Sequence, residues 1–166
     1  MNFEFKTIEK ANITDNDRKI FGNLLKLQNK VFPDKNGGFD KKADRCLLIC
    51  IVYNDEKPIA IGGIKRATEF DFLPRCANLP EKAELFDWEL GYIYTLPNFR
   101  GQKIGSKMVD LIMEKYGNKN LMASTELNPK NNMQKILLNK GFKQCGETWK
   151  SKHNLDLGLF LKFKNL

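Results

Sequence analysis

The sequence predicts an α/β or α+β fold, a sheet with helices on its faces, in the order β-α-β-β-β-α-β-α-β-β. Short segments with alternating or continuous apolar residues are interleaved with longer segments of helical period. Turn residues such as glycine, proline and asparagine separate these segments. The length of 166 residues, with 42% hydrophobic and 29% charged residues, fits one domain over residues 1–166.

The first third of the chain predicts a strand, a helix and a hairpin. Apolar and charged residues alternate over 3–9, as in a half-buried strand. Thr14, with Asp17 three positions later, is a capping signal for a helix that ends at Phe32-Pro33. The next elements are two strands joined by a turn, 46–53 and 59–67. Gly62-Gly63 inside the second strand indicates a bulge or a close backbone contact.

The rest of the chain alternates between strands and helices after a long loop. Residues 69–86 have no clear period and are interpreted as a loop with at most a short helical turn. Asn128-Pro129 predicts a helix start, with Asn128 as the cap and Pro129 at the first helical position. The expected elements are a strand at 88–96, a helix ending at Gly117, a strand at 121–127, a helix ending at Gly141, and a hairpin of 142–149 with 155–163.

Composition narrows the functional classes. The N-terminus is charged where a signal peptide is apolar, and the longest apolar run, 46–53, is far shorter than the roughly 20 residues of a membrane-spanning helix. We therefore expect a cytoplasmic protein without a membrane partner. Four cysteines without a C-x-x-C pair, and the single His153, favour buried thiols over a metal site or a disulfide.

The positive charge is concentrated in one segment. Residues 97–166 carry 13 basic and 5 acidic side chains, a difference of 8 that equals the formal charge of +8 of the whole chain. Such a segment attracts polyanions such as a nucleotide, a nucleic acid or a phosphorylated cofactor. The alternative is a lysine-rich surface that is merely solvated.

The most specific stretch runs from Glu89 to Ser106 and reads strand, tight turn, helix. A turn with glycine at a helix start directs several backbone N–H groups and the positive end of the helix dipole to one place, which suits a pyrophosphate. Arg100, Lys103 and Lys107 add full charges. The stretch lacks the Walker A and three-glycine dinucleotide patterns. A plain strand–turn–helix connection is the alternative.

This stretch resembles motif A of the GNAT superfamily of N-acetyltransferases, Arg/Gln-x-x-Gly-x-Gly/Ala, with Arg100, Lys103 and Gly105 at the three defined positions. The lead-in over 95–101 matches apolar-x-Pro-x-x-Arg-Gly, and 128–142 resembles motif B, an Asn-led helix that ends in Gly-Phe. The resemblance covers residues 87–145. It implies a GNAT-like domain with a mixed, mostly antiparallel central sheet flanked by helices on both faces.

The resemblance also implies acetyl-CoA as the acyl donor and no metal. Backbone N–H groups of 101–106 would hold the pyrophosphate, and the pantetheine arm would lie along 88–96 like an added strand, where that strand splays from 121–127. A backbone N–H near Tyr94 or Thr95 would stabilise the oxyanion. The predicted donor-binding residues are Ile93, Tyr94, Thr95, Arg100, Gly101, Gln102, Lys103, Ile104, Gly105, Ser106 and Asn131.

Acyl transfer to an amine needs a base, because an ammonium group has no lone pair. Related enzymes place a base glutamate on the strand that holds Glu89, and Asp87 is the second candidate. Alternatively, Glu89 faces solvent or binds the charge of the acceptor. Tyr94 or Tyr92 could serve as the catalytic acid, unless each is a core residue.

The sequence departs from the family pattern at two positions. Lys103 stands where motif A has its first glycine, and we expect it to adopt ordinary helical geometry. Leu137 stands where many members have a tyrosine that protonates the thiolate, and leucine cannot donate a proton. CoA thiolate is a fair leaving group without an acid.

The leading interpretation is an N-acetyltransferase that moves an acetyl group from acetyl-CoA to a primary amine by direct attack in a ternary complex. Six acids between residues 69 and 89, against two basic residues, favour a cationic acceptor. A CoA-binding module without catalysis is an alternative, as is an RNA-directed acetyltransferase or nucleic-acid binder. The sequence leaves the acceptor, the acyl chain length and the oligomeric state, monomer or homodimer, open.

Overall fold

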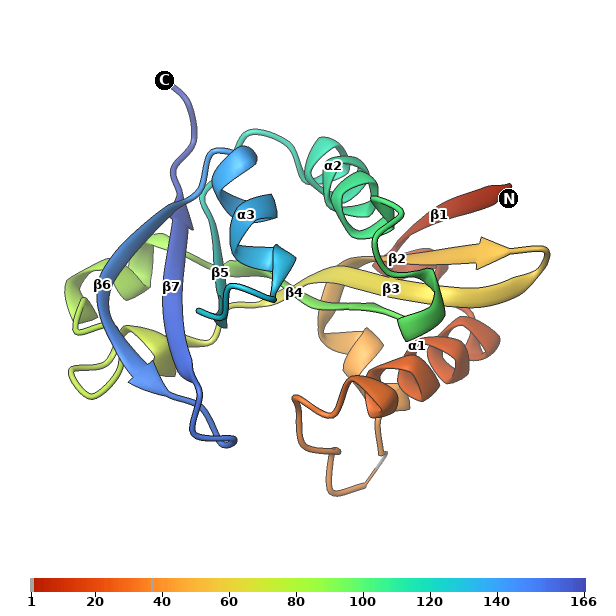
Figure 1. Cartoon of the computed structure of the whole chain (residues 1–166), viewed down its shortest axis with the longest axis horizontal. Coiled ribbons are helices and arrows are strands. Elements are labelled where there is room, and N and C mark those ends of the chain that lie inside the picture. Colours follow the sequence, from red (N-terminus) through yellow and green to blue (C-terminus); the bar gives the residue numbers. More distant parts are fainter. Residues whose placement is uncertain (1, 37) are drawn as a thin grey trace. The chain divides into compact units, whose positions relative to one another are not determined.

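The computed structural model describes residues 2–36 and 38–166, and its elements follow the predicted order (Figure 1). The three α-helices are α1 (Asp15–Gln28), α2 (Ile104–Tyr116) and α3 (Asn132–Asn139). The seven strands are β1 (Phe3–Glu9), β2 (Cys46–Asn54), β3 (Lys57–Arg66), β4 (Trp88–Thr95), β5 (Leu121–Glu126), β6 (Lys143–Lys150) and β7 (Asp156–Lys162).

The strands form a mixed, mostly antiparallel sheet in the order β1-β2-β3-β4-β5-β7-β6. β1 with β2, β2 with β3, β5 with β7 and β6 with β7 are antiparallel pairs. β4 and β5 are parallel, with Glu89 opposite Met122. The chain divides into two compact units, Met1–Lys65 with Leu90–Gly117, and Arg66–Glu89 with Asn118–Leu166, so that β4 runs from one unit into the other.

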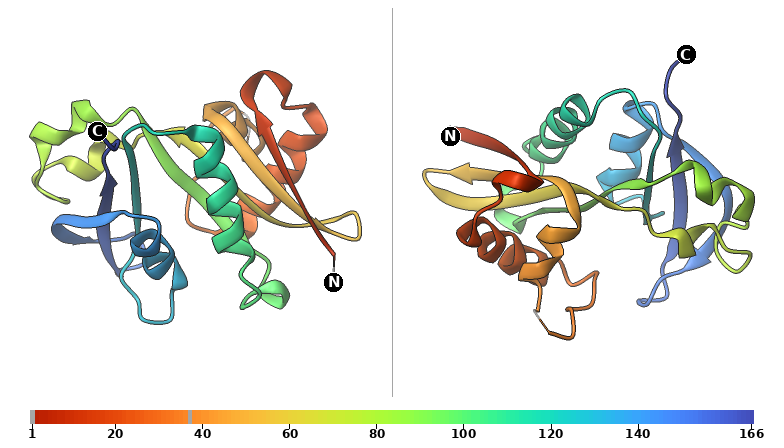
Figure 2. Two further views of the ribbon diagram at one scale, coloured as in Figure 1. Left: turned by 90° about the horizontal axis from the view of Figure 1, so that it is seen from above. Right: turned by 180° about the vertical axis from the view of Figure 1, so that it is seen from behind.

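In the first unit, α1 and α2 cover opposite faces of the β1–β3 sheet (Figures 1 and 2). Ile61 belongs to the core cluster that contains Phe21 of α1. Its neighbour Gly62 faces α2, because a Cβ there would lie 3.1 Å from Ile112 and 3.3 Å from Met108. Adjacent residues of a strand point to opposite faces, which places the two helices on either side. The close contact predicted at Gly62 is confirmed.

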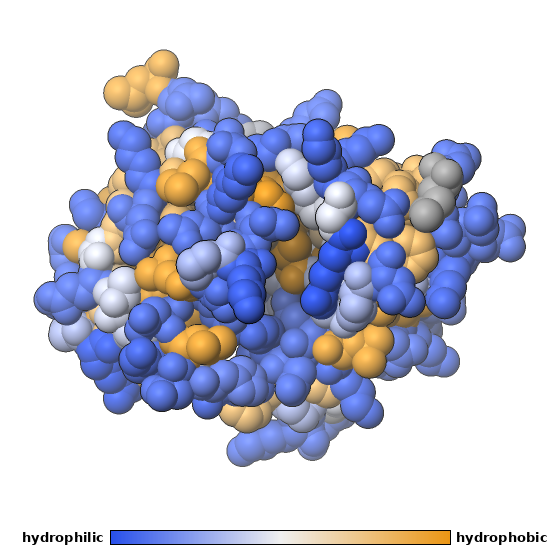
Figure 3. Space-filling model, in the orientation of Figure 1, coloured by the Kyte–Doolittle hydropathy of each residue, from blue (hydrophilic) through white to orange (hydrophobic). Residues whose placement is uncertain are grey.

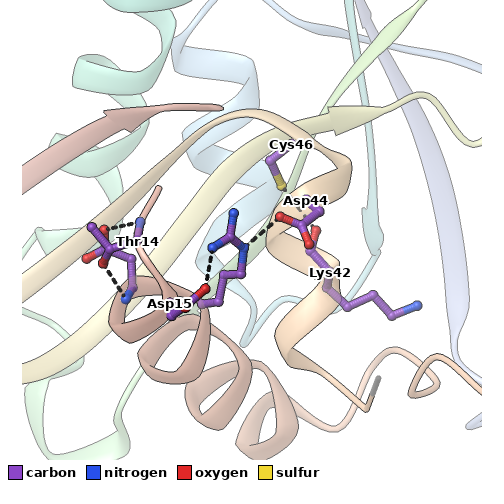
Figure 4. Close-up of polar contacts among 7 residues, drawn as sticks. Thr14, Asp15, Lys42, Asp44 and Cys46 are labelled. Carbon is purple, nitrogen blue, oxygen red and sulfur yellow. Dashed lines mark hydrogen bonds and ion pairs between the residues drawn. The ribbon is translucent and has the colours of Figure 1, made fainter. Parts of the chain in front are cut away.

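Polar contacts fix the N-terminal end of α1 (Figure 4). Thr14 and Asp17 form a capping box: the Thr14 hydroxyl accepts from the Asp17 N–H at 3.1 Å, and the Asp17 carboxylate accepts from the Thr14 N–H at 3.0 Å. Arg18 bridges Asp15 at 2.9 Å and Asp44 at 2.8 Å, which ties the helix to the segment before β2. The predicted cap is confirmed, but α1 ends at Gln28, ahead of the predicted stop.

In the second unit, α3 packs on β5 and β6, and the segment between β3 and β4 covers the other face of the strands (Figure 2). That segment contains two short 3₁₀ helices, Glu69–Phe72 and Pro80–Leu85. Its buried Phe72 and Phe86 stack with ring centroids 5.8 Å apart and join Leu159 and Leu161 of β7 in one apolar cluster. The stretch predicted as a loop is therefore ordered by burying its aromatic residues.

The predicted start of α3 is wrong. The side chain of Asn128 accepts a hydrogen bond from the Lys130 N–H at 3.0 Å, which closes a local turn and does not start a helix. The helix begins three residues later, where Asn131 is the N-cap and its side chain accepts from the Met133 N–H at 2.9 Å. Several asparagines in this stretch could take the same role, and Asn131 is the one whose amide also donates to Thr125 and to the Glu126 carbonyl.

Candidate functional site

The turn before α2 is shaped by two residues in the left-handed region. After a 3₁₀ turn over Pro97–Phe99, Gly101 has φ of 79° and Lys103 has φ of 60°. Lys103 is the N-cap of α2, and no side chain caps the helix. The first N–H groups of an α-helix have no intrahelical partner. The backbone donors at the start of α2 therefore have no side-chain acceptor, and they lie at the positive end of the helix dipole.

The conformation of Lys103 differs from the prediction of ordinary helical geometry. A left-handed residue with a Cβ costs about 1–2 kcal/mol, which glycine avoids. The chain keeps at residue 103 the backbone shape that glycine favours, and it places an ammonium group there. No atom lies within 4 Å of a Cβ built on Gly101, so this part of the turn is open toward solvent.

Cationic side chains surround the turn. The Arg100 Nε donates to the Thr95 carbonyl at 3.1 Å, and its guanidinium carbon lies 5.7 Å from the centre of the Tyr94 ring. The Lys107 Nζ lies 4.7 Å from the centre of the Phe5 ring. An open groove of about 510 Å³ runs between the start of β1 and the first turns of α2. Uncapped donors, an open glycine and nearby cations fit a pyrophosphate group.

Strand β4 leads into this turn and contains an irregularity. Tyr92 has φ of 59° in the middle of the strand, a left-handed value typical of a β-bulge. The Ile93 carbonyl accepts a hydrogen bond from Gln28 Nε2 at 2.9 Å. The donor is thus a side chain of α1 and not the backbone of a neighbouring strand. The Leu96 N–H donates to the Ile59 carbonyl of β3. Because neighbouring amides of an extended chain point to opposite edges, the Thr95 N–H lies on the edge away from β3.

The two tyrosines of β4 have different surroundings. Tyr92 is 8% exposed and packs edge-on against Phe21 of α1, with ring centroids 5.9 Å apart, and Lys65 Nζ lies 5.5 Å from the centre of its ring. Tyr92 is thus a core residue. Tyr94 is only partly buried and is covered by Arg100.

Glu89 is buried, with 5% of its surface exposed, so it does not face solvent. Its Oε2 accepts two hydrogen bonds from Thr68, from the backbone N–H at 2.9 Å and from the hydroxyl at 2.7 Å. The Ala67 N–H donates to the Asp87 carbonyl at 3.0 Å, and the Arg66 guanidinium lies 4.7 Å from the centre of the Trp88 ring. Residues 66–68 and 87–89 thus form a stem that closes the segment between β3 and β4.

The candidate residues of α3 have structural roles. Asn131 uses its carbonyl oxygen as the helix cap, and its amide nitrogen donates to Thr125 Oγ1 at 3.3 Å and to the Glu126 carbonyl at 3.4 Å. Leu137 is fully buried. The position from which a tyrosine would protonate a thiolate is therefore filled by a core side chain.

Of the six acids predicted to attract the acceptor, two are buried and four are exposed. The buried acids are Asp71, which is 8% exposed, and Glu89. The exposed members are Glu69, Glu81, Glu84 and Asp87. One face of the protein is shown in Figure 3, where hydrophilic residues predominate and apolar residues are scattered.

The described residues contain neither a cluster of metal ligands nor a membrane-spanning helix. Over residues 2–36 and 38–166, no three or more His, Cys, Asp or Glu side chains are grouped so that they could hold a metal ion. Within the same ranges, no helix is long and apolar enough to cross a bilayer.

Three features of the site were missed by sequence reasoning. Thr68, the partner of Glu89, lies 21 residues away in the chain, and no spacing relates the two. The left-handed φ at Tyr92 directly follows Gly91, and a glycine inside a strand is a signal that could have located the bulge. Gln28 was assigned only to the helix, although it is the last residue of α1 and binds β4. An excess of polar residues at the end of an otherwise amphipathic helix is the one signal that could have drawn attention to Gln28.

Comparison with solved structures shows the fold. The chain is similar to Escherichia coli ElaA, with a TM-score of 0.69 and 12% identity, covering 96% of this chain and 99% of that one. An acyl-CoA N-acyltransferase from Pseudomonas aeruginosa has a TM-score of 0.63 and 13% identity, covering 97% and 99%. A chain of a NatC complex, bound to Gag peptide and CoA, has a TM-score of 0.66 and 13% identity, with complete coverage of both chains.

The sequence itself matches a family profile. No curated protein matches the chain. The profile of the acetyltransferase (GNAT) family matches residues 18–138, which include most of α1, the Glu89 strand, the turn before α2 and almost all of α3. The mixed sheet, the uncapped turn after Arg100 and this match agree: the chain belongs to the GNAT family of acetyltransferases.

Proposed function

We propose that residues 1–166 work as one acyltransferase domain that moves an acetyl group from acetyl-CoA to a primary amine by direct attack in a ternary complex. The observation that carries the proposal is the uncapped start of α2, preceded by the left-handed Gly101 and Lys103. Family membership supports the acyl transfer, and one structural neighbour was solved with CoA.

The donor would be held by the chain's own amides and cations. The N–H groups that follow Gly101 would donate hydrogen bonds to the pyrophosphate oxygens, and Lys103 and Lys107 would add positive charge. The pantetheine arm would pair with the edge of β4 like an extra strand. The Ile93 carbonyl already accepts from Gln28, and the Thr95 carbonyl already accepts from Arg100. The N–H groups of Ile93 and Thr95 are therefore the proposed contacts for the ligand on that edge.

Glu89 is the proposed general base. The acceptor must lose a proton before its nitrogen can attack, either directly to a carboxylate or through a water molecule. A buried carboxylate with a fixed orientation suits that task better than Asp87, which is exposed. Glu89 would take the proton, and the amine nitrogen would then form a bond to the thioester carbonyl carbon.

The tetrahedral intermediate would collapse without help from α3. Its oxyanion would accept a hydrogen bond from a backbone N–H near Tyr94 or Thr95, and the carbon–sulfur bond would then break. Leu137 cannot protonate the leaving sulfur, so CoA would depart as the thiolate. The hydroxyl of Tyr94 is the remaining candidate donor on β4, because Tyr92 is packed in the core.

The cysteines support direct attack over a covalent acyl-enzyme. Burial raises the pKa of the Cys46 and Cys50 thiols to about 12, so both are protonated at neutral pH. A thiol is a poor nucleophile compared with its thiolate. All four cysteines are free thiols, which agrees with a reducing compartment such as the cytoplasm.

The acceptor is proposed to be a cationic amine. The exposed acids of the segment between β3 and β4 would attract a second positive charge on the acceptor, as in a polyamine, an aminoglycoside or a lysine-containing peptide. Turnover restricted to neutral or anionic amines would contradict this part of the proposal.

Calorimetry with CoA and a thiol-release assay with acetyl-CoA test the function together. We expect CoA binding and amine-dependent release of CoA from a panel of mono- and polyamines. Binding without turnover would instead identify a CoA-binding module, a possibility raised by Lys103 and Leu137. Retention of RNA with a steep salt dependence would favour a nucleic-acid substrate. Failure of CoA to bind at millimolar concentration would refute the proposal.

A further inference from the structure

Glu89 is held by one residue through two different groups. The Thr68 backbone N–H and the Thr68 hydroxyl both donate to Oε2, at 2.9 Å and 2.7 Å. The backbone contact would persist with any residue at 68 except proline, whereas the hydroxyl contact depends on the side chain. The two contacts direct one carboxylate oxygen toward Thr68 and so fix the rotation of the whole group.

The geometry is unusual for a plain structural link. Thr68 lies just beyond β3 and Glu89 is the second residue of β4. The stem between them already has the Ala67 N–H on the Asp87 carbonyl and the Arg66 guanidinium against Trp88. Closing the segment therefore does not require a buried carboxylate. Burying one is unfavourable unless donors compensate it, and Thr68 supplies two.

We propose that Thr68 is a positioning residue for Glu89, whose carboxylate it holds in one orientation ready to accept a proton. This inference rests on the proposed role of Glu89 as general base. The N–H and the hydroxyl of Thr68 fix the carboxylate before an acceptor binds. Thr68 would act on the reaction through the Glu89 carboxylate, to which both groups donate.

Thr68→Val tests the inference, because valine keeps the shape and the backbone N–H and removes only the hydroxyl. We expect kcat to fall about tenfold, the lower range for a general-base effect, while KM for acetyl-CoA stays within about twofold. Thr68→Ser keeps a hydroxyl at this position and should restore the rate.

A double-mutant cycle separates positioning from general damage. In the Glu89→Gln background, Thr68→Val should have no further effect on kcat, because the hydroxyl acts through the carboxylate. Thr148→Val provides a matched control, since Thr148 is exposed on β6 of the same unit. Equal losses from Thr68→Val in both backgrounds, or a failure of Thr68→Ser to restore the rate, would overturn the inference.

A measurement without turnover keeps this inference distinct from the proposed function. In protein labelled with ¹³C at the glutamate carboxyl, the Glu89 signal, assigned by its loss in Glu89→Gln, should have a different chemical shift in Thr68→Val than in wild type and Thr68→Ser, because the carboxylate loses a donor. Identical chemical shifts in all three proteins would refute the hydroxyl's role even if an acceptor is known. A changed chemical shift in a protein that acetylates no amine would leave the Thr68–Glu89 coupling intact and refute the proposed function.

Discussion

The start of α2 and the surroundings of Glu89 are built in opposite ways. At the start of α2, backbone donors lack a capping side chain, and the neighbouring Gly101 opens to solvent. Around Glu89, the polar groups are already paired inside the protein, with Thr68 on the carboxylate and Ala67 on the Asp87 carbonyl. The difference teaches that open backbone donors can take a ligand, whereas paired polar groups are held in place before any ligand binds.

The largest expected effect is the loss of kcat when Glu89 is replaced. Glu89→Gln keeps the size of the side chain and removes the carboxylate, so kcat should fall by about 10²- to 10⁴-fold, while calorimetry shows CoA affinity within about twofold. Glu114→Gln, an exposed acid in the second half of α2, is the matched control and should keep full activity. A Glu89→Gln enzyme with wild-type kcat would show that the buried carboxylate is only structural.

Two glycines with similar φ values allow a crowded position to be compared with an open one. Gly146 has φ of 73°, and a Cβ there would overlap the Ala77 carbonyl oxygen, whereas Gly101 has φ of 79° and open space. Gly146→Ala should lower the free energy of unfolding by about 3 kcal/mol, from strain and overpacking together. Gly101→Ala should lower it by about 1 kcal/mol, from backbone strain alone. Urea denaturation measures both, and equal losses would contradict the contrast.

Charge reversal beside the open turn should weaken donor binding. Lys103→Glu places a negative charge next to the proposed pyrophosphate site, and we expect the Kd for CoA to rise about tenfold, or about 1.4 kcal/mol. The loss should shrink at high salt, because exposed charges are screened. Lys115→Glu makes the same charge change in the last turn of α2 and should leave the Kd nearly unchanged. Similar losses in both variants would point to net charge, not to the turn.

The smallest expected effect concerns the thiols. Because burial raises the pKa of Cys46 and Cys50 to about 12, both should stay protonated and unreactive toward iodoacetamide at pH 8. Activity should survive treatment under native conditions, with alkylation of Cys145, which is partly exposed, detected first by mass spectrometry. Rapid inactivation that follows modification of Cys46 or Cys50 would revive a covalent route.

Much of the fold could be predicted because periodicity reports which face of an element is buried. The bounds of β1 and α2 agree with the alternation over 3–9 and with the apolar stripe that ends at Gly117. The start of α3 failed because Asn128 and Asn131 offer the same capping chemistry, and only tertiary contacts to Thr125 choose between them.

The site could be predicted only in part. The motif located the turn after Arg100, because a glycine and cations at a helix start have a direct physical meaning. It gave the wrong backbone for Lys103, because side-chain chemistry does not determine φ when the turn imposes it. The pairing of Thr68 with Glu89 was beyond reach, because it depends on how 20 intervening residues return the chain to β4. The roles of the predicted donor-binding residues stay predictions.

The stem at residues 66–68 and 87–89 has a consequence for how the chain can be altered. It closes the intervening segment by contacts at its own two ends, and the buried Phe72 and Phe86 attach that segment to β7. The exposed positions between these attachments, such as Glu81 and Glu84, can therefore be exchanged without removing either. This freedom makes them the first positions to vary in a library that seeks a changed preference for the proposed acceptor.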